Sequence, residues 1–153
     1  MNWTKEQREA IEYGGENILL AAAAGSGKTA VLVQRIIELI SPMRADGTKN
    51  ENPADIGELL VLTFTDAAAS EMRDKIANAI RSALEQNPED RHLKKQSIMV
   101  NSADISTIHS FCLNVLKSNI HLTDLPVDFV PASNEESTML LSDAIDSVLE
   151  RYY

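Results

Sequence analysis

The stretch Ala22-Ala23-Ala24-Gly25-Ser26-Gly27-Lys28-Thr29 directly follows the apolar run Ile18-Leu19-Leu20-Ala21. This order predicts a strand, a glycine-containing loop and then a helix. In a loop of this kind, backbone N–H groups surround the phosphates of a nucleotide, Lys28 reaches the β- and γ-phosphates, and Thr29 binds Mg²⁺. The helix that starts near Lys28 directs its positive end at the same phosphates. The stretch therefore predicts a nucleoside triphosphate site, with Lys28 and Thr29 as catalytic residues and Thr29 as the metal ligand.

The loop departs from the general pattern G-x-x-x-x-G-K-[ST] at its first position, where Ala22 stands. Gly25 and Gly27 keep the two backbone positions at which the chain must bend closely around phosphate. An ordinary glycine turn between a strand and a helix is the alternative. The coincidence of strand, loop and helix at the required places favours the phosphate loop.

Composition limits the possible functions of these 153 residues. The net charge of −9 argues against electrostatic coating of nucleic acid, although a narrow channel can still hold a single strand by stacking its bases. The sequence contains no apolar run long enough to span a membrane, so we expect no membrane partner. A single cysteine, Cys112, favours a reducing, cytoplasmic location.

Hydrophobic periodicity and capping signals predict alternating strands and helices. Thr4 and Gln7 form a capping-box pattern at the start of a short helix that ends near Tyr13. Strands are expected at 17–21, 59–64 and 105–108, and further helices at 28–40, 67–84, 91–100, 109–119 and 135–153. This alternation predicts an α/β fold with a mainly parallel sheet.

Four motifs occur in an order that resembles one family. They are Trp3-Thr4-x-x-Gln7, Ala22–Thr29, Val61–Met72 and Ile105–Phe111. Together they are similar to the Q motif, the phosphate loop and motifs Ia and Ib of UvrD/Rep-like superfamily 1 DNA helicases. The residues within these motifs most resemble those of AddA-type helicase–nuclease subunits. The resemblance implies a P-loop NTPase (RecA-like) parallel sheet flanked by helices. It also implies a partial ATP-binding domain 1A at 1–122 and the start of a 1B-like helical segment at 123–153.

The resemblance also implies roles for individual residues. It implies the cofactors ATP and Mg²⁺, bound by Gln7, Ala22, Ala23, Ala24, Gly25, Ser26, Gly27, Lys28, Thr29 and Ala30. Gln7 would recognise the edge of the adenine base. The capping box is the alternative role for Gln7, and the two roles are compatible. Contacts to single-stranded DNA would come from Thr63, Phe64, Thr65, Thr107, His109 and Ser110. Core packing is the alternative for Phe64, and helix capping is the alternative for Thr107 and Ser110.

Two positions differ from the family pattern, and one motif is missing. Asp66 stands where the family usually has Asn, and Ala30 stands where UvrD itself carries Arg. The Asp-Glu-x-Gln-Asp motif, which would hold Mg²⁺ and orient water, does not occur in the sequence. We therefore expect the amino-terminal part of an enzyme that processes DNA ends in double-strand-break repair. Its implied partners are single- or double-stranded DNA ends and an AddB-like second subunit.

Other interpretations stay open at this point. A small phosphotransferase shares the phosphate loop, but it should carry arginine-rich lid segments, whereas the stretch from 121 to 150 has seven acidic residues and no Lys or Arg. A nucleotide-binding switch without catalysis is a third possibility. His109 and Cys112 lie three residues apart, as in a catalytic pair or half of a zinc site, but no second cysteine completes such a site.

The strand edges around Leu19 and Leu60 are expected to be unpaired, because the strand that would lead to the missing motif belongs in the same sheet. Unpaired edges recruit other chains, so we expect self-association.

Overall fold

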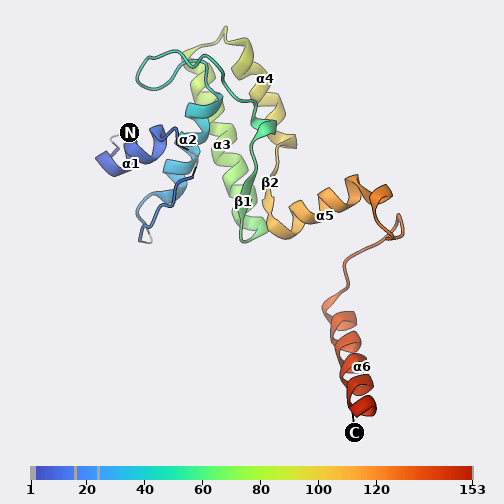
Figure 1. Ribbon diagram of the computed structural model, residues 1–153. Coiled ribbons are helices and arrows are strands. Elements are labelled where there is room, and N and C mark those ends of the chain that lie inside the picture. The colour runs from blue at the N-terminus through green and yellow to red at the C-terminus, as the bar shows by residue number, and fades with distance from the viewer. Residues whose placement is uncertain (1–2, 16, 24, 153) are drawn as a thin grey trace. The chain divides into compact units, whose positions relative to one another are not determined.

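The computed structural model describes residues 3–15, 17–23 and 25–152, which form two compact units, Met1–Cys112 and Leu113–Tyr153 (Figure 1). The helices are α1 (Lys5–Glu12), α2 (Lys28–Ile40), α3 (Asp66–Gln86), α4 (Arg91–Met99), α5 (Ile108–Ser118) and α6 (Asn134–Tyr152). The strands are β1 (Val61–Thr63) and β2 (Ile105–Thr107), and the 3-10 turns are η1 (Ile56–Glu58), η2 (Val100–Ser102) and η3 (Ile120–Leu122). None of the described helices is long and apolar enough to cross a membrane.

The sheet of the described residues consists of β1 and β2, which pair in parallel. Val61 lies opposite Ile105, and Thr63 lies opposite Thr107, so both strands end at the same edge. Helix α3 runs along these strands and contacts both of them (Figure 1). The predicted mixture of helices and parallel strands is confirmed in a small sheet of two strands, and the predicted helices form with their ends displaced by two residues at most.

The strand predicted at 17–21 is wrong. Residues 17–23 have no regular secondary structure, and the side chain of Leu19 is 94% exposed. A strand needs a neighbour to accept and donate its backbone hydrogen bonds, and β1 pairs only with β2 among the described residues. Apolar sequence alone therefore does not produce a strand here. Leu60 and Leu62 are also exposed, although the apolar composition of 59–64 is typical of a strand that is buried on both faces.

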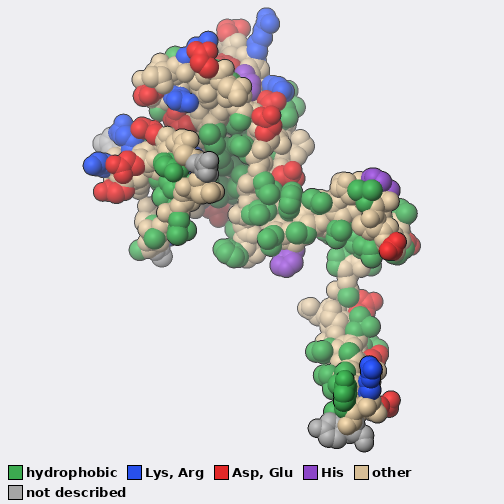
Figure 2. Space-filling view, in the orientation of Figure 1, with side chains coloured by type: hydrophobic (Ala, Val, Ile, Leu, Met, Phe, Trp, Pro, Cys, Tyr) green, Lys and Arg blue, Asp and Glu red, His purple; other side chains and the backbone are tan. Residues whose placement is uncertain are grey.

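The main core lies between α2, α3 and the two strands. Its fully buried side chains include Ile40 of α2, Ile76 and Ile80 of α3, and Ile105 of β2. A smaller cluster joins α1 to α2 through Ala10, Ile11 and Val31, with Trp3 packed against it. In the second unit, the apolar side chains of α6 remain exposed (Figure 2); they include Met139, Leu140, Ile145, Val148 and Leu149.

A buried polar network fixes the turn that precedes β1. The Oε1 atom of Gln96, a residue with no exposed surface, accepts a hydrogen bond of 2.7 Å from the backbone N–H of Ile56. Its Nε2 donates to Asp55 Oδ1 at 2.6 Å, and Lys95 Nζ donates to Asp55 Oδ2 at 2.6 Å. The bond from the Lys95 ammonium, followed by that from the Gln96 amide, holds the pKa of the Asp55 carboxyl below its ordinary value.

We expect Gln96→Leu to destabilise the chain, because it removes the acceptor of a buried N–H donor at Ile56. An unsatisfied buried group costs about 1–3 kcal/mol, and urea unfolding followed by circular dichroism measures this loss. Lys94→Ala is the matched control on the exposed side of the same helix, and it should change the free energy of unfolding by less than about 0.5 kcal/mol. Equal losses in the two variants would contradict the prediction.

Candidate functional site

Two glycines give the loop before α2 its shape. Gly25 and Gly27 have φ angles of 77° and 82°, in the left-handed region that favours glycine. Gly27 is also the N-cap of α2, and no side chain caps this helix end. The first N–H groups of a helix have no partner within the helix and carry its positive partial charge. This end of α2 can therefore bind an anion. Ala24, a predicted member of the loop, lies outside the described residues.

The side chain of Lys28 lies against the same loop. Its Nζ donates hydrogen bonds of 2.8 Å to Ala22 O and 2.7 Å to Ala23 O. Thr29 follows in the first turn of α2 with an exposed side chain, and Ala30 is partly buried. The ammonium group is thus held at the loop, next to the positive helix end, where it adds to the attraction for phosphate.

Gln7 connects α1 to the loop. Its backbone N–H donates to Thr4 Oγ1 at 3.3 Å and its Oε1 accepts from Thr4 N at 3.0 Å, which confirms the predicted capping box. Its Nε2 donates to Ser26 O at 3.1 Å. An amide oxygen has two lone pairs and an amide nitrogen has two protons. Gln7 therefore keeps one free acceptor position and one free donor position, and its orientation is fixed from both sides.

A cavity of about 300 Å³ joins Gln7 to Lys28. Its lining combines apolar residues of α1, α2 and the segment before the loop with a few polar groups, as in most small-molecule sites; the lining residues are Thr4, Glu6, Gln7, Ala10, Leu20, Ala21, Ala22, Ser26, Lys28 and Val31. The sequence-predicted residues Gln7, Ala22, Ser26 and Lys28 thus surround one space.

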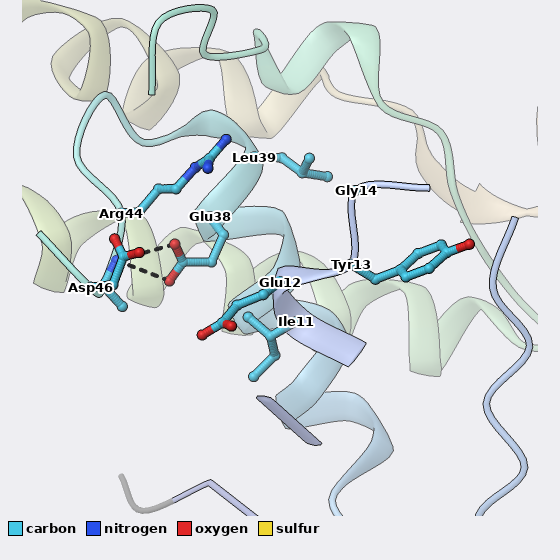
Figure 3. A pocket seen from close by; sticks show the side chains of 9 residues that line it. Ile11, Glu12, Tyr13, Gly14, Glu38, Leu39, Arg44 and Asp46 are labelled. Atoms are coloured by element: carbon cyan, nitrogen blue, oxygen red, sulfur yellow. Dashed lines mark hydrogen bonds between the residues drawn. The ribbon is translucent and has the colours of Figure 1, made fainter. Parts of the chain in front are cut away.

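A second hollow, of about 280 Å³, lies at the other ends of α1 and α2 (Figure 3). The carboxylates of Glu12, Glu38 and Asp46 line it, together with Arg44. The Glu38 carboxylate accepts hydrogen bonds from the backbone N–H of Ala45 at 3.1 and 3.3 Å. None of the described residues of the phosphate loop lines this hollow, and its carboxylates repel phosphate. It therefore does not fit a nucleotide.

The ends of the two strands form a separate surface. The hydroxyl of Thr63 donates to Thr65 O at 3.0 Å, and Thr65 Oγ1 caps α3 by accepting from Ala68 N at 3.1 Å. Between them, the side chain of Phe64 is fully exposed. The core-packing alternative for Phe64 is therefore wrong, and the aromatic ring is free to stack on a planar group.

On the neighbouring strand, Thr107 acts as a helix cap. Its Oγ1 accepts from Ser110 N at 3.2 Å and donates to Ser110 Oγ at 2.9 Å, and Thr107 is buried. This confirms the capping interpretation of Thr107, whose hydroxyl is thereby engaged. The first turn of α5 leaves His109 exposed and Ser110 partly exposed. The pairing of Thr63 with Thr107 brings the predicted contact residues of both strands to one edge.

A metal centre receives no support from the described side chains. Within the residues that the structure describes, no three His, Cys, Asp or Glu side chains are grouped so that they could hold a metal ion. Cys112 is a free, exposed thiol on α5. Among the described side chains, His109 and Cys112 thus have no third protein ligand with which to complete a zinc site.

Two arginines with extensive backbone contacts do not stand out in the sequence. Arg35 Nη1 donates to Ala10 O at 2.8 Å and to Ile11 O at 3.3 Å. Arg73 Nη1 donates to the carbonyls of Val100, Asn101 and Ala103 at 3.1–3.2 Å, and its Nη2 donates to Ile105 O at 2.7 Å. The only sequence signal for these contacts is that each arginine lies on a helix face that is otherwise largely apolar.

Comparison with known proteins identifies relatives along nearly the whole chain. Residues 3–152 match the family described as the UvrD/REP helicase N-terminal domain. Proteins whose names describe the A-type subunit of an ATP-dependent helicase/nuclease are similar: that of Clostridioides difficile (strain 630) is 53% identical over 151 residues, 99% of this chain and 11% of the relative. That of Thermoanaerobacter sp. (strain X514) is 52% identical over 151 residues, 99% of this chain and 12% of the relative. That of Oceanobacillus iheyensis is 48% identical over 153 residues, the whole of this chain and 12% of the relative. The chain thus spans about an eighth or less of the length of these relatives.

We expect Phe64→Ala to leave the stability of the chain nearly unchanged, because an exposed ring loses no packing on truncation. The free energy of unfolding should change by less than about 0.5 kcal/mol. Ile105→Ala, at a fully buried position two residues before the end of β2, should lose about 2–5 kcal/mol. Thermal and urea unfolding measure both changes, and a large loss for Phe64→Ala would restore the core-packing interpretation.

Proposed function

The chain belongs to the family of the UvrD/REP helicase N-terminal domain, and we propose that it forms the ATP-binding part of an ATP-dependent DNA helicase. The proposed parent enzyme unwinds and processes DNA ends in double-strand-break repair, together with an AddB-like second subunit. Its fold would be a P-loop NTPase (RecA-like) sheet, with residues 1–122 in domain 1A and residues 123–153 at the start of a 1B-like segment. The observation that carries this proposal is the cavity between Gln7 and Lys28, with the phosphate loop on its wall.

The residues around this cavity fit ATP and Mg²⁺. The uncapped N-terminus of α2 and the ammonium of Lys28 attract the phosphates, and Lys28 must exchange its bonds to Ala22 O and Ala23 O for bonds to phosphate. The exposed hydroxyl of Thr29 would hold Mg²⁺. When bound, ATP supplies the phosphoanhydride bond whose hydrolysis drives a helicase.

Gln7 is suited to read the base. Glutamine recognises adenine through paired bonds to N6 and N7, for which the amide needs one acceptor and one donor. The bonds to Thr4 N and Ser26 O leave one of each free. The same bonds prevent the amide from turning over, since a rotated amide would place NH₂ against Thr4 N and oxygen against Ser26 O. In this proposal Gln7 therefore distinguishes adenine from guanine.

The strand-end surface is the proposed path of single-stranded DNA. Ligands of open α/β sheets bind outside the carboxyl ends of the strands, which here carry Thr63, Phe64 and Thr65 on one strand and His109 and Ser110 beyond the other. An exposed ring can stack on any base, which suits a motor that moves along DNA regardless of sequence. Asp66 is also exposed at this edge, so backbone phosphates should pass on the side of His109.

We expect the chain to bind ATP–Mg²⁺ without steady-state turnover, because the Asp-Glu-x-Gln-Asp motif is not part of its sequence. Lys28→Ala should weaken this binding about 10- to 150-fold, the loss of a charged hydrogen bond worth about 1.5–3 kcal/mol. Calorimetric titration measures the affinity, with Lys94→Ala as the control for the loss of one exposed lysine. Binding that is unaffected by Lys28→Ala, or turnover that Lys28→Ala abolishes, would contradict this expectation.

Phe64→Ala should weaken binding of a fluorescent single-stranded oligonucleotide by about 1–3 kcal/mol, the contribution of one aromatic stacking platform. Fluorescence anisotropy at low ionic strength gives the affinity per folded molecule. Ile98→Ala is the matched control, because Ile98 is an exposed apolar residue on α4, away from the strand ends. The proposed DNA path would be wrong if the two variants bound DNA equally well.

A further inference from the structure

Arg35 holds the end of α1 from a different helix. The last four carbonyls of a helix have no partner within it and form the negative end of its dipole. Helix α1 has no basic residue in its own last turn. Arg35 of α2 fills this role, since its Nη1 donates to Ala10 O at 2.8 Å and to Ile11 O at 3.3 Å.

Among the residues that the structure describes, this contact is one of two polar attachments between α1 and the segment formed by the phosphate loop and α2. The other is the bond from Gln7 Nε2 to Ser26 O. Between them lies the apolar cluster of Ala10, Ile11 and Val31. Apolar contacts are not directional, so they hold α1 against α2 without fixing its rotation or its displacement along the axis. The two polar attachments fix the rotation of α1 and its position along the axis.

The spacing along α1 connects Arg35 to the base-reading amide. Gln7 precedes Ala10 by three residues and Ile11 by four, so all three lie on one face of the helix. A shift of the end of α1 therefore moves the Gln7 side chain by a similar amount. The Gln7 amide lies directly at the loop, since a Cβ atom at Gly27 would be in van der Waals contact with Gln7 Nε2, at 3.4 Å.

We propose that Arg35 is a positioning residue for base specificity: by binding the carboxyl end of α1, it keeps the Gln7 amide oriented between Thr4 and Ser26. The inference rests on the proposed function, in which Gln7 reads adenine. Without Arg35, α1 retains its capping box and its apolar contacts, but the bond to Ser26 O loosens. The amide can then turn over, which breaks its paired bonds to adenine N6 and N7. Guanine presents acceptors at both O6 and N7, so it forms a single bond with the amide in either orientation, and the preference for adenine falls.

The test compares the affinities of Arg35→Met for ATP, GTP and inorganic tripolyphosphate by calorimetry in the presence of Mg²⁺. Met keeps the apolar stem of the side chain and removes the guanidinium. We expect ATP affinity to fall about five- to thirtyfold, the factor for one or two lost hydrogen bonds, while GTP affinity should stay unchanged, because guanine offers the amide a single matching bond in either orientation. Tripolyphosphate has no base, so its affinity should remain unchanged.

Arg73→Met is the matched control, because Arg73 also donates to several backbone carbonyls but contacts η2 and β2 instead of α1. It should retain the preference for ATP over GTP. Arg35→Lys keeps the charge but not the planar fork, so it should show an intermediate preference. It also provides the comparison if Arg35→Met does not fold.

The variant Gln7→Ala distinguishes a failure of the role of Arg35 from a failure of the adenine site. A preference for ATP that Gln7→Ala removes and Arg35→Met retains would overturn the role of Arg35 and leave the adenine site standing. If Gln7→Ala retains the preference, the adenine site and the role of Arg35 both fail. An equal loss of ATP and tripolyphosphate affinity in Arg35→Met would show a general disturbance of the loop, which also overturns the inference.

Discussion

The parallel pairing of Val61–Thr63 with Ile105–Thr107 is the constraint on which the arrangement of the first unit depends. It turns Val61 and Ile105 towards the core, where α3 covers them. The same register aligns the two strand ends, so the chain enters α3 and α5 at one edge. Phe64 and His109 come from segments more than forty residues apart in sequence, and they reach a common surface only through this pairing. A shift of one residue would turn the side chains of a strand to the opposite face and bury Leu62 instead of Val61.

The helices could be predicted because their signals lie close together in the sequence. Features that depend on distant partners, such as strand pairing, could not be predicted in this way. The start of α1 follows from Thr4 and Gln7, because the capping box joins residues three apart. The start of α2 follows from Gly27, whose positive φ ends the loop directly before Lys28. The segment 17–21 has the composition of a strand but lacks a pairing neighbour among the described residues, which composition cannot reveal. Arg35 lies 24 and 25 residues from the carbonyls it binds, so only the folded structure shows its role. The exposure of Phe64 likewise depends on how the turn after β1 directs the ring.

Several side chains serve the backbone and the candidate sites at once. Gln7 caps α1 and faces the cavity, and its amide has enough donor and acceptor positions for both tasks. Thr107 differs, because its hydroxyl proton and a lone pair are already used by Ser110. In the proposed DNA path, Thr107 therefore acts by fixing the first turn of α5, which carries the exposed His109. Capping and function are alternatives only where the polar atoms of a side chain are fully used by the cap.

The packing of α2 on α3 connects the cavity between Gln7 and Lys28 to the strand-end surface. The phosphate loop leads into α2, and the turn that carries Phe64 leads into α3. Ile36, Ile37 and Ile40 of α2 share one core with Met72, Ile76 and Ile80 of α3. Close-packed cores transmit displacement because they contain few voids to absorb it. A movement of α2 when Lys28 exchanges loop carbonyls for phosphate must therefore either move α3 or open this core. Since opening the core exposes several isoleucine side chains, each worth about 1.5–3 kcal/mol of burial, the two helices should move together. The proposed ATP site and the proposed DNA path thus share a physical connection that uses only side chains of this chain.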